Sequence, residues 1–127
     1  MVQRSLVTSA LPYANGPIHL GHMVEHIQSD IYVRYLRSTG QEVVFLCADD
    51  THGTPIEVNA QKQGMTPEAF VERWGVEHQI DLADFHVKYD HYSSTNSDDN
   101  RRFAELIYLR AKEAGFIETR DVEQAFD

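Results

Sequence analysis

Apolar and polar positions change their spacing twice within the first fifty residues. Residues 6–11 form a short run rich in apolar and β-branched side chains, which is typical of a buried strand. Apolar residues then recur at helical spacing over about 18–39, and Gly40 suits the position after the last helical turn. Residues 42–48 form a second apolar run, too short for a helix and typical of a strand covered on both faces. The apolar stripe of the predicted helix consists of Leu20, Met23, Ile27, Ile31 and Tyr35.

The rest of the chain predicts three further helices, over about 54–64, from Thr66 through Ile80 or Leu82, and over about 98–114. Gly75 lies in the middle of the second of these and is expected to weaken it. A short strand or extended segment is expected around Tyr89. Capping boxes are expected at two helix starts, formed by Thr54 with Glu57 and by Thr95 with Asp98.

The order strand, helix, strand predicts a βαβ unit, and therefore an α/β fold with a parallel sheet. In open parallel sheets, ligands bind beyond the carboxyl ends of the strands. Two polar segments, 12–22 and 49–55, follow the two predicted strands. We expect them to meet in one crevice.

The first of these segments leads into a helix through the sequence Pro-Tyr-Ala-Asn-Gly-Pro-Ile-His-Leu-Gly-His. Unpaired N–H groups and the positive end of the helix dipole make such a junction a favourable place for a phosphate. His19 and His22 share one face of the first turn and can donate hydrogen bonds to a phosphate, and Gly21 lets a flat group approach the backbone. The alternative is a pair of histidines at a helix start that have no chemical role.

The second segment contains two adjacent carboxylates, Asp49 and Asp50. They repel each other, so at least one is expected to have a cation or hydrogen-bond donors beside it. Neighbouring side chains of an extended segment point in opposite directions, so only one should face the crevice, where a substrate ammonium group would suit it. The alternative is a solvated turn. His78, His86 and His91 form no pattern and are interpreted as surface or satisfied core residues.

Composition narrows the class of protein. A chain of 127 residues with 42% hydrophobic residues is long enough for one core. Its formal net charge of −9 argues against a nucleic-acid surface over most of the chain, so any contact with RNA must be local or made by other parts. Cys47 is the one cysteine, which excludes a disulfide framework. There is no signal peptide and no run of membrane-spanning length, and we expect a cytoplasmic protein without a membrane partner.

Both polar segments resemble those of one enzyme family. The sequence from Pro12 to His22 resembles the His-x-Gly-His signature of class I aminoacyl-tRNA synthetases. Together with Ala10-Leu11 before it and residues 47–56 behind, it resembles the methionyl-tRNA synthetases closely. Isoleucine enzymes share the Pro-Tyr-Ala-Asn-Gly lead-in, but they generally carry Gly-Pro-Pro at 9–11 and a Trp-Asp-x-His-Gly type segment at 48–53. Both differences favour methionine.

The resemblance implies activation of methionine by ATP, as its Mg²⁺ complex, to methionyl-adenylate, followed by transfer to tRNA. It implies that residues 1–127 are the first half of a Rossmann-like catalytic domain, incomplete, and end near the start of a connective insertion at about 116–127. The family's lysine-rich loop and its zinc site would lie in segments absent from this chain. We therefore expect part of a longer enzyme that is inactive by itself, with exposed apolar surface that favours self-association.

Carried over by position, the resemblance also implies roles for single residues. The catalytic residues would be His19 and His22. The ATP site would comprise Asn15, His19, Gly21 and His22, with Gly21 under the adenosine. The methionine site would comprise Leu11, Tyr13 and Asp50, with Ala10, Glu25 and His52 at its rim. No resident metal is expected in this chain.

Two other classes of protein remain open at this point. A small nucleotidyltransferase would share the His-x-Gly-His segment and the βαβ unit, but it would transfer adenylate to a phosphorylated acceptor. A non-catalytic metal-binding module could use His22 and His26, which have i,i+4 spacing, with Asp49, Asp50 or His52.

Overall fold

The computed structural model describes residues 4–121, which fall into two compact units that meet between Asn96 and Ser97. The described residues of the second unit contain the helix α4 (Asp98–Glu113). The elements of the first unit are, in chain order, β1 (Arg4–Thr8), α1 (Leu20–Ser38), β2 (Glu42–Asp49), α2 (Thr54–Lys62), α3 (Pro67–Asp84) and β3 (His91–Ser94).

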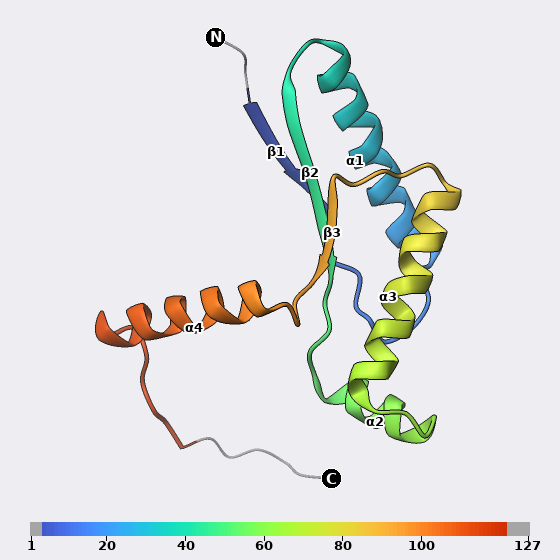
Figure 1. Ribbon diagram of the computed structural model, residues 1–127. Helices are drawn as coiled ribbons and strands as arrows, with labels where there is room; N and C mark the ends of the chain where they lie inside the picture. The colour runs from blue at the N-terminus through green and yellow to red at the C-terminus, as the bar shows by residue number, and fades with distance from the viewer. Residues whose placement is uncertain (1–3, 122–127) are drawn as a thin grey trace. The chain divides into compact units, whose positions relative to one another are not determined.

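The three strands form one parallel sheet in the order β1-β2-β3, as Figure 1 shows. Thr8 of β1 is level with Leu46 of β2, and Asp49 is level with Ser94 of β3. Because all three strands run in the same direction, their carboxyl ends lie at the same edge of the sheet. The predicted α/β fold with a parallel sheet is confirmed.

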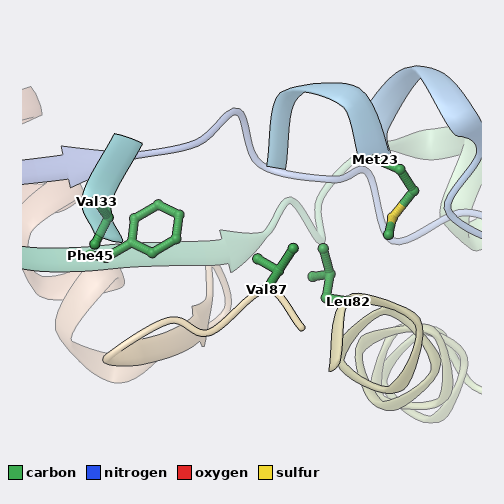
Figure 2. Close-up of a cluster of buried hydrophobic side chains, with 5 residues drawn as sticks. All are labelled: Met23, Val33, Phe45, Leu82 and Val87. Atoms are coloured by element: carbon green, nitrogen blue, oxygen red, sulfur yellow. The ribbon is translucent and has the colours of Figure 1, made fainter. Parts of the chain in front are cut away.

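The main core lies between the sheet and the two long helices, α1 and α3. Phe45 of β2 is fully buried and belongs to the same cluster as Met23 and Val33 of α1 and Leu82 of α3 (Figure 2). The predicted stripe on α1 is only partly right. Met23 is buried, but Leu20, Ile31 and Tyr35 are exposed, because the buried face of α1 is Met23, His26, Asp30, Val33 and Leu36. His26 and Asp30 are polar but lie on this buried face, so the apolar residues alone indicated a different face of the helix.

The opposite face of the sheet carries apolar side chains that no helix of the first unit covers. Exposure alternates along β1 and β2, and Leu6 and Val44 are 67% and 49% exposed. The prediction that β2 is covered on both faces is therefore wrong for the first unit. The expected exposed apolar surface is present, and self-association through it stays a prediction.

Both predicted capping boxes are wrong. Helix α2 is preceded by Gly53, which has no side chain to cap it, and Thr54 is already the first helical residue. Helix α3 begins as predicted, with the Thr66 side chain accepting from Ala69 N. In the second unit, α4 (Asp98–Glu113) is capped by Ser97, whose side chain accepts from Asn100 N, and none of its residues is buried.

The predicted connective insertion at about 116–127 lies partly outside the described residues, and its start stays a prediction. Among the described residues, no helix combines the length and the apolar character that crossing a membrane requires.

Candidate active site

The two polar segments that follow β1 and β2 lie side by side and are joined through their backbones. Asp50 N donates to Pro12 O, and Ala14 N donates to Asp50 O, both at 2.8 Å. Tyr13 and Asp50 form an isolated parallel bridge. The prediction that these segments meet beyond the carboxyl ends of the strands is confirmed.

Two side-chain contacts extend this junction. Asn59 of α2 donates to Asn15 Oδ1 at 2.9 Å, so the first loop is also attached to α2. The Tyr13 hydroxyl lies over Gly53, where a Cβ would be only 2.8 Å from it. Gly53 has φ of 125°, a conformation that favours glycine. Tyr13 therefore bridges the first loop to the turn before α2.

His19 and His22 both cap the start of α1. His19 Nδ1 accepts from Gly21 N at 3.1 Å, and His22 Nδ1 accepts from His19 N at 3.3 Å. Their rings stack, with centroids 3.8 Å apart and planes 19° apart. The expectation of unpaired N–H groups at this helix start is therefore wrong for Gly21 and His19, whose N–H groups are paired with imidazole nitrogens.

This capping arrangement requires neutral imidazoles. A ring nitrogen that accepts a backbone hydrogen bond carries no proton, so in each ring the proton must sit on Nε2. Burial, and then the neighbouring His19, lower the pKa of His22 and favour its neutral form. Each ring keeps one N–H donor, at Nε2, for a group beyond the helix start.

Gly21 is explained by the same arrangement. A Cβ there would lie 2.9 Å from Cε1 and 3.0 Å from Nδ1 of His19. The flat group that lies against the Gly21 backbone in this structure is thus the His19 imidazole, and contact with adenosine stays a prediction.

The two adjacent aspartates have different environments. Asp49 is buried, and its Oδ1 accepts from Tyr92 Oη at 2.8 Å and from His78 Nδ1 at 2.6 Å. Asp50 is exposed, and its backbone joins the first loop. This agrees with the expectation that the side chains point in opposite directions and that at least one carboxylate has donors. Burial and the negative charge of Asp49 raise the pKa of Tyr92 well above its usual value, so it remains a donor.

Sequence reasoning did not find the role of His78. It is a satisfied core residue, one of the two interpretations that the sequence allowed, and it also connects both loops: Nδ1 is 2.6 Å from Asp49 Oδ1, and Nε2 is 2.7 Å from Gly16 O. A signal was present, because Phe70, Trp74 and His78 recur at helical spacing and so share a face of α3. Trp74 stacks on His78, with centroids 6.4 Å apart.

The residues predicted at the rim have separate positions. Glu25 Oε1 accepts from Ala10 N at 2.5 Å, which fastens the chain after β1 to α1. His52 is exposed, and its Nε2 is 3.2 Å from Thr95 O. Leu11 and Tyr13 are 43% and 36% exposed, so both remain accessible to a ligand.

The ligands suggested for a metal-binding module do not converge. His26 is buried and hydrogen-bonds to the Tyr89 hydroxyl, which in turn donates to Ser9. Across residues 4–121, no three His, Cys, Asp or Glu side chains form a group that could hold a metal ion.

The chain is similar to known synthetases over almost its whole length. Residues 5–127 match the family model described as tRNA synthetases class I (M). A methionine–tRNA ligase of Myxococcus xanthus (strain DK1622) is 62% identical over 126 residues, which cover 99% of this chain and 18% of that protein.

Solved structures give the same result for the fold. A Mycobacterium tuberculosis methionyl-tRNA synthetase in complex with methionyl-adenylate superposes with a TM-score of 0.86 and 26% identity, over 90% of this chain and 22% of that one. The Agrobacterium radiobacter K84 agnB2 LeuRS, in a ternary complex with tRNA and LeuAMS, superposes with a TM-score of 0.82 over 90% of this chain and 15% of that one. Its 22% identity supports a shared fold alone. The chain thus spans about a fifth of the length of the relatives it matches.

Proposed function

The chain belongs to the class I (M) family of tRNA synthetases, and we propose that it is the first part of a methionine–tRNA ligase. The whole protein would activate methionine with ATP, as its Mg²⁺ complex, and transfer the methionyl group to tRNA. The observation that carries this proposal is the backbone pairing of Asp50 with Pro12 and Ala14. It brings the predicted methionine residues next to the loop that leads to the histidine pair. The relative that binds methionyl-adenylate supports this choice of substrates.

In the first half-reaction, a methionine carboxylate oxygen would form a bond to the α-phosphorus of ATP, and the bond from that phosphorus to the pyrophosphate oxygen would break. Holding the two reactants in line can contribute about 7–11 kcal/mol. The Nε2–H groups of His19 and His22 would donate to phosphate oxygens as charge develops on them. Asn15 would lie near the phosphates, and Gly21 under the adenosine.

The methionine site would combine one charge with apolar walls. The exposed Asp50 carboxylate would pair with the methionine ammonium group, and Asp49 is already occupied by Tyr92 and His78. Leu11 and Tyr13 would contact the thioether side chain, which suits apolar and aromatic surroundings. Ala10, Glu25 and His52 would remain at the rim. Contacts with tRNA would be made mainly by parts of the protein outside this chain.

The test is exchange of labelled pyrophosphate into ATP by the complete protein that contains this chain. We expect exchange to depend on methionine far more than on isoleucine. The reverse preference would favour an isoleucine-type synthetase, and transfer of adenylate to a phosphorylated acceptor without methionine would favour a nucleotidyltransferase. The 127-residue chain by itself should show negligible exchange, and robust exchange by it would contradict the expectation that other parts complete the site.

A further inference from the structure

Asp49 and His78 form a buried ionisable pair that the proposed reaction does not use. Their side chains are 5% and 1% exposed. The pair lies directly behind the junction of the two loops, because Asp49 is the last residue of β2 and His78 reaches Gly16 in the first loop. Gly16 lies between Asn15 and the histidine pair of α1.

Both ring nitrogens of His78 face acceptors. Nδ1 is 2.6 Å from the Asp49 carboxylate, and Nε2 is 2.7 Å from the Gly16 carbonyl. Neither acceptor can donate a proton when Asp49 is ionised, so both hydrogen bonds exist together only if His78 carries two ring protons. A neutral His78 would keep its proton at Asp49, because a charge-assisted bond is stronger than one to a carbonyl, and would lose the bond to Gly16.

We propose that His78, as an imidazolium paired with Asp49, is a positioning residue that fixes the Gly16 carbonyl and thereby aligns the loop of residues 12–19 with the strand end that carries Asp50. This inference rests on the proposed function. The hydrogen bonds of His78 are to Asp49 and to the Gly16 carbonyl, so its effect on the reaction passes through the backbone of the loop.

The surroundings of His78 support the charged form. The groups that face it are Asp49 from β2, Tyr92 from β3 through Asp49, Asp81 from α3 itself and His22 from α1. Burial alone lowers the pKa of His78, but the bonds to Asp49 and Gly16 and the charges of Asp49 and Asp81 outweigh burial, and the pKa is raised. The His78 imidazolium therefore loses a proton at a pH above the ordinary histidine pKa.

Two amide variants separate the two bonds. In His78→Gln, the amide nitrogen lies near the former Nε2 position and can still donate to Gly16 O. In His78→Asn, the shorter side chain can reach Asp49 but not Gly16. For methionine-dependent exchange by the complete protein, we expect kcat/KM to fall about 10- to 100-fold in His78→Asn, because small displacements of a positioned group lower rates by factors of this size. In His78→Gln, kcat/KM should stay within roughly threefold of wild type.

The pH profile gives a readout that a purely structural role would not move. Over about pH 6 to pH 9, which spans the ordinary histidine pKa of about 6.5, kcat/KM of the wild type should have an alkaline decrease that His78→Gln lacks. Titration of the substrates affects both proteins equally, so the difference between the profiles reports on His78. His91→Gln, a change at an exposed histidine of β3, is the matched control and should follow the wild-type profile.

Asp49→Asn provides a second variant if His78→Gln does not fold. The asparagine amide can donate to Nδ1 of a neutral His78, which then donates to Gly16 from Nε2 at any pH in this range, so the alkaline decrease should disappear while activity at neutral pH is kept. Three results would each overturn the positioning role. They are wild-type activity in His78→Asn, equal losses of activity in the two His78 variants, and an unchanged alkaline decrease in Asp49→Asn. Absence of methionine-dependent exchange in the wild type would instead overturn the proposed function.

Discussion

A Cβ built on Gly75 would lie 2.8 Å from Oδ2 of Asp49, so the buried carboxylate packs directly against the backbone of α3. Glycine inside a helix is less favourable than alanine by about 0.8–1.0 kcal/mol, and on propensity alone Gly75→Ala should stabilise the protein. We expect the opposite, a free energy of unfolding lower by about 1–3 kcal/mol, because the added methyl group displaces Asp49 or α3. Denaturant unfolding of the protein measures this change.

Val76→Ala is the matched control, because Val76 is the next residue of α3 and is 53% exposed. Its effect should stay within about 0.5 kcal/mol of wild type. A Gly75→Ala variant that is more stable than wild type would show that Asp49 can move away at little cost. The close contact would then not explain the glycine.

Gly53→Ala should weaken methionine binding through Tyr13. The φ of 125° at Gly53 is unfavourable for alanine, and its Cβ would lie 2.8 Å from the Tyr13 hydroxyl. We expect the KM for methionine to rise about tenfold, which corresponds to about 1.4 kcal/mol, because the side chain proposed to contact methionine must shift. Gly40→Ala is the control: Gly40 also has positive φ, of 83°, but nothing lies within 4 Å of its Cβ position.

A Tyr13→Phe background separates the contact with Tyr13 from the backbone strain at Gly53, because it removes the contact and keeps the strain. In that background the hydroxyl is gone, so the increase in KM caused by Gly53→Ala should be smaller than in the wild-type background. An equal increase in KM with and without the Tyr13 hydroxyl would mean that backbone strain at Gly53 alone is responsible.

The sequence predicted the parts of this molecule that depend on local pattern. Strong apolar runs indicated the two main strands, and glycine and proline marked the helix ends. The first strand was predicted too late in the chain and as buried: β1 covers Arg4–Thr8 instead of residues 6–11, and none of its residues is buried. The meeting of the loops at Asp50 also followed, because parallel strands have a common carboxyl edge. The capping box at Thr54 failed because Gly53 adopts a positive φ, for which the sequence gives no direct signal.

The remaining wrong or incomplete predictions concern residues whose hydrogen-bond partners are distant in the chain. His26 and Asp30 lie on the buried face of α1 because each has a partner from the segment after α3: the Tyr89 hydroxyl for His26 and Lys88 N for Asp30. For the same reason, His78 was interpreted only as a surface or satisfied core residue. Its two partners are 29 and 62 positions away in the chain, and only the folded structure brings them together.

Acid should destabilise the start of α1 through His22. Its pKa is lowered, first by burial and then by His19. The neutral form is favoured in the folded state, so this contribution to stability is fully present above the ordinary pKa of 6.5 and decreases as the pH falls below it. His22→Asn keeps an acceptor near the Nδ1 position but does not titrate. We expect its melting temperature to fall less than that of wild type between about pH 7 and pH 5.

The pKa of His26 is lowered in the same direction, mainly by burial, and this residue titrates in both proteins. The difference between wild type and His22→Asn therefore reports on His22. Identical acid-side curves would show that protonation of His22 does not disturb the hydrogen bond that it accepts from His19 N.

Asp50→Asn should lower activity while leaving the fold intact. The hydrogen bonds of Asp50 to Pro12 and Ala14 are made by its backbone, and its side chain is exposed, so the free energy of unfolding should change by less than about 0.5 kcal/mol. Loss of a charge-assisted bond to the methionine ammonium group, worth roughly 1.5–3 kcal/mol, should lower kcat/KM for methionine about 10- to 100-fold. Methionine-dependent pyrophosphate exchange by the complete protein measures this loss.

Glu68→Gln, which neutralises an exposed carboxylate in the first turn of α3, should leave exchange unchanged. Equal activity of the two variants would show that the methionine ammonium group is held by a group other than the Asp50 carboxylate.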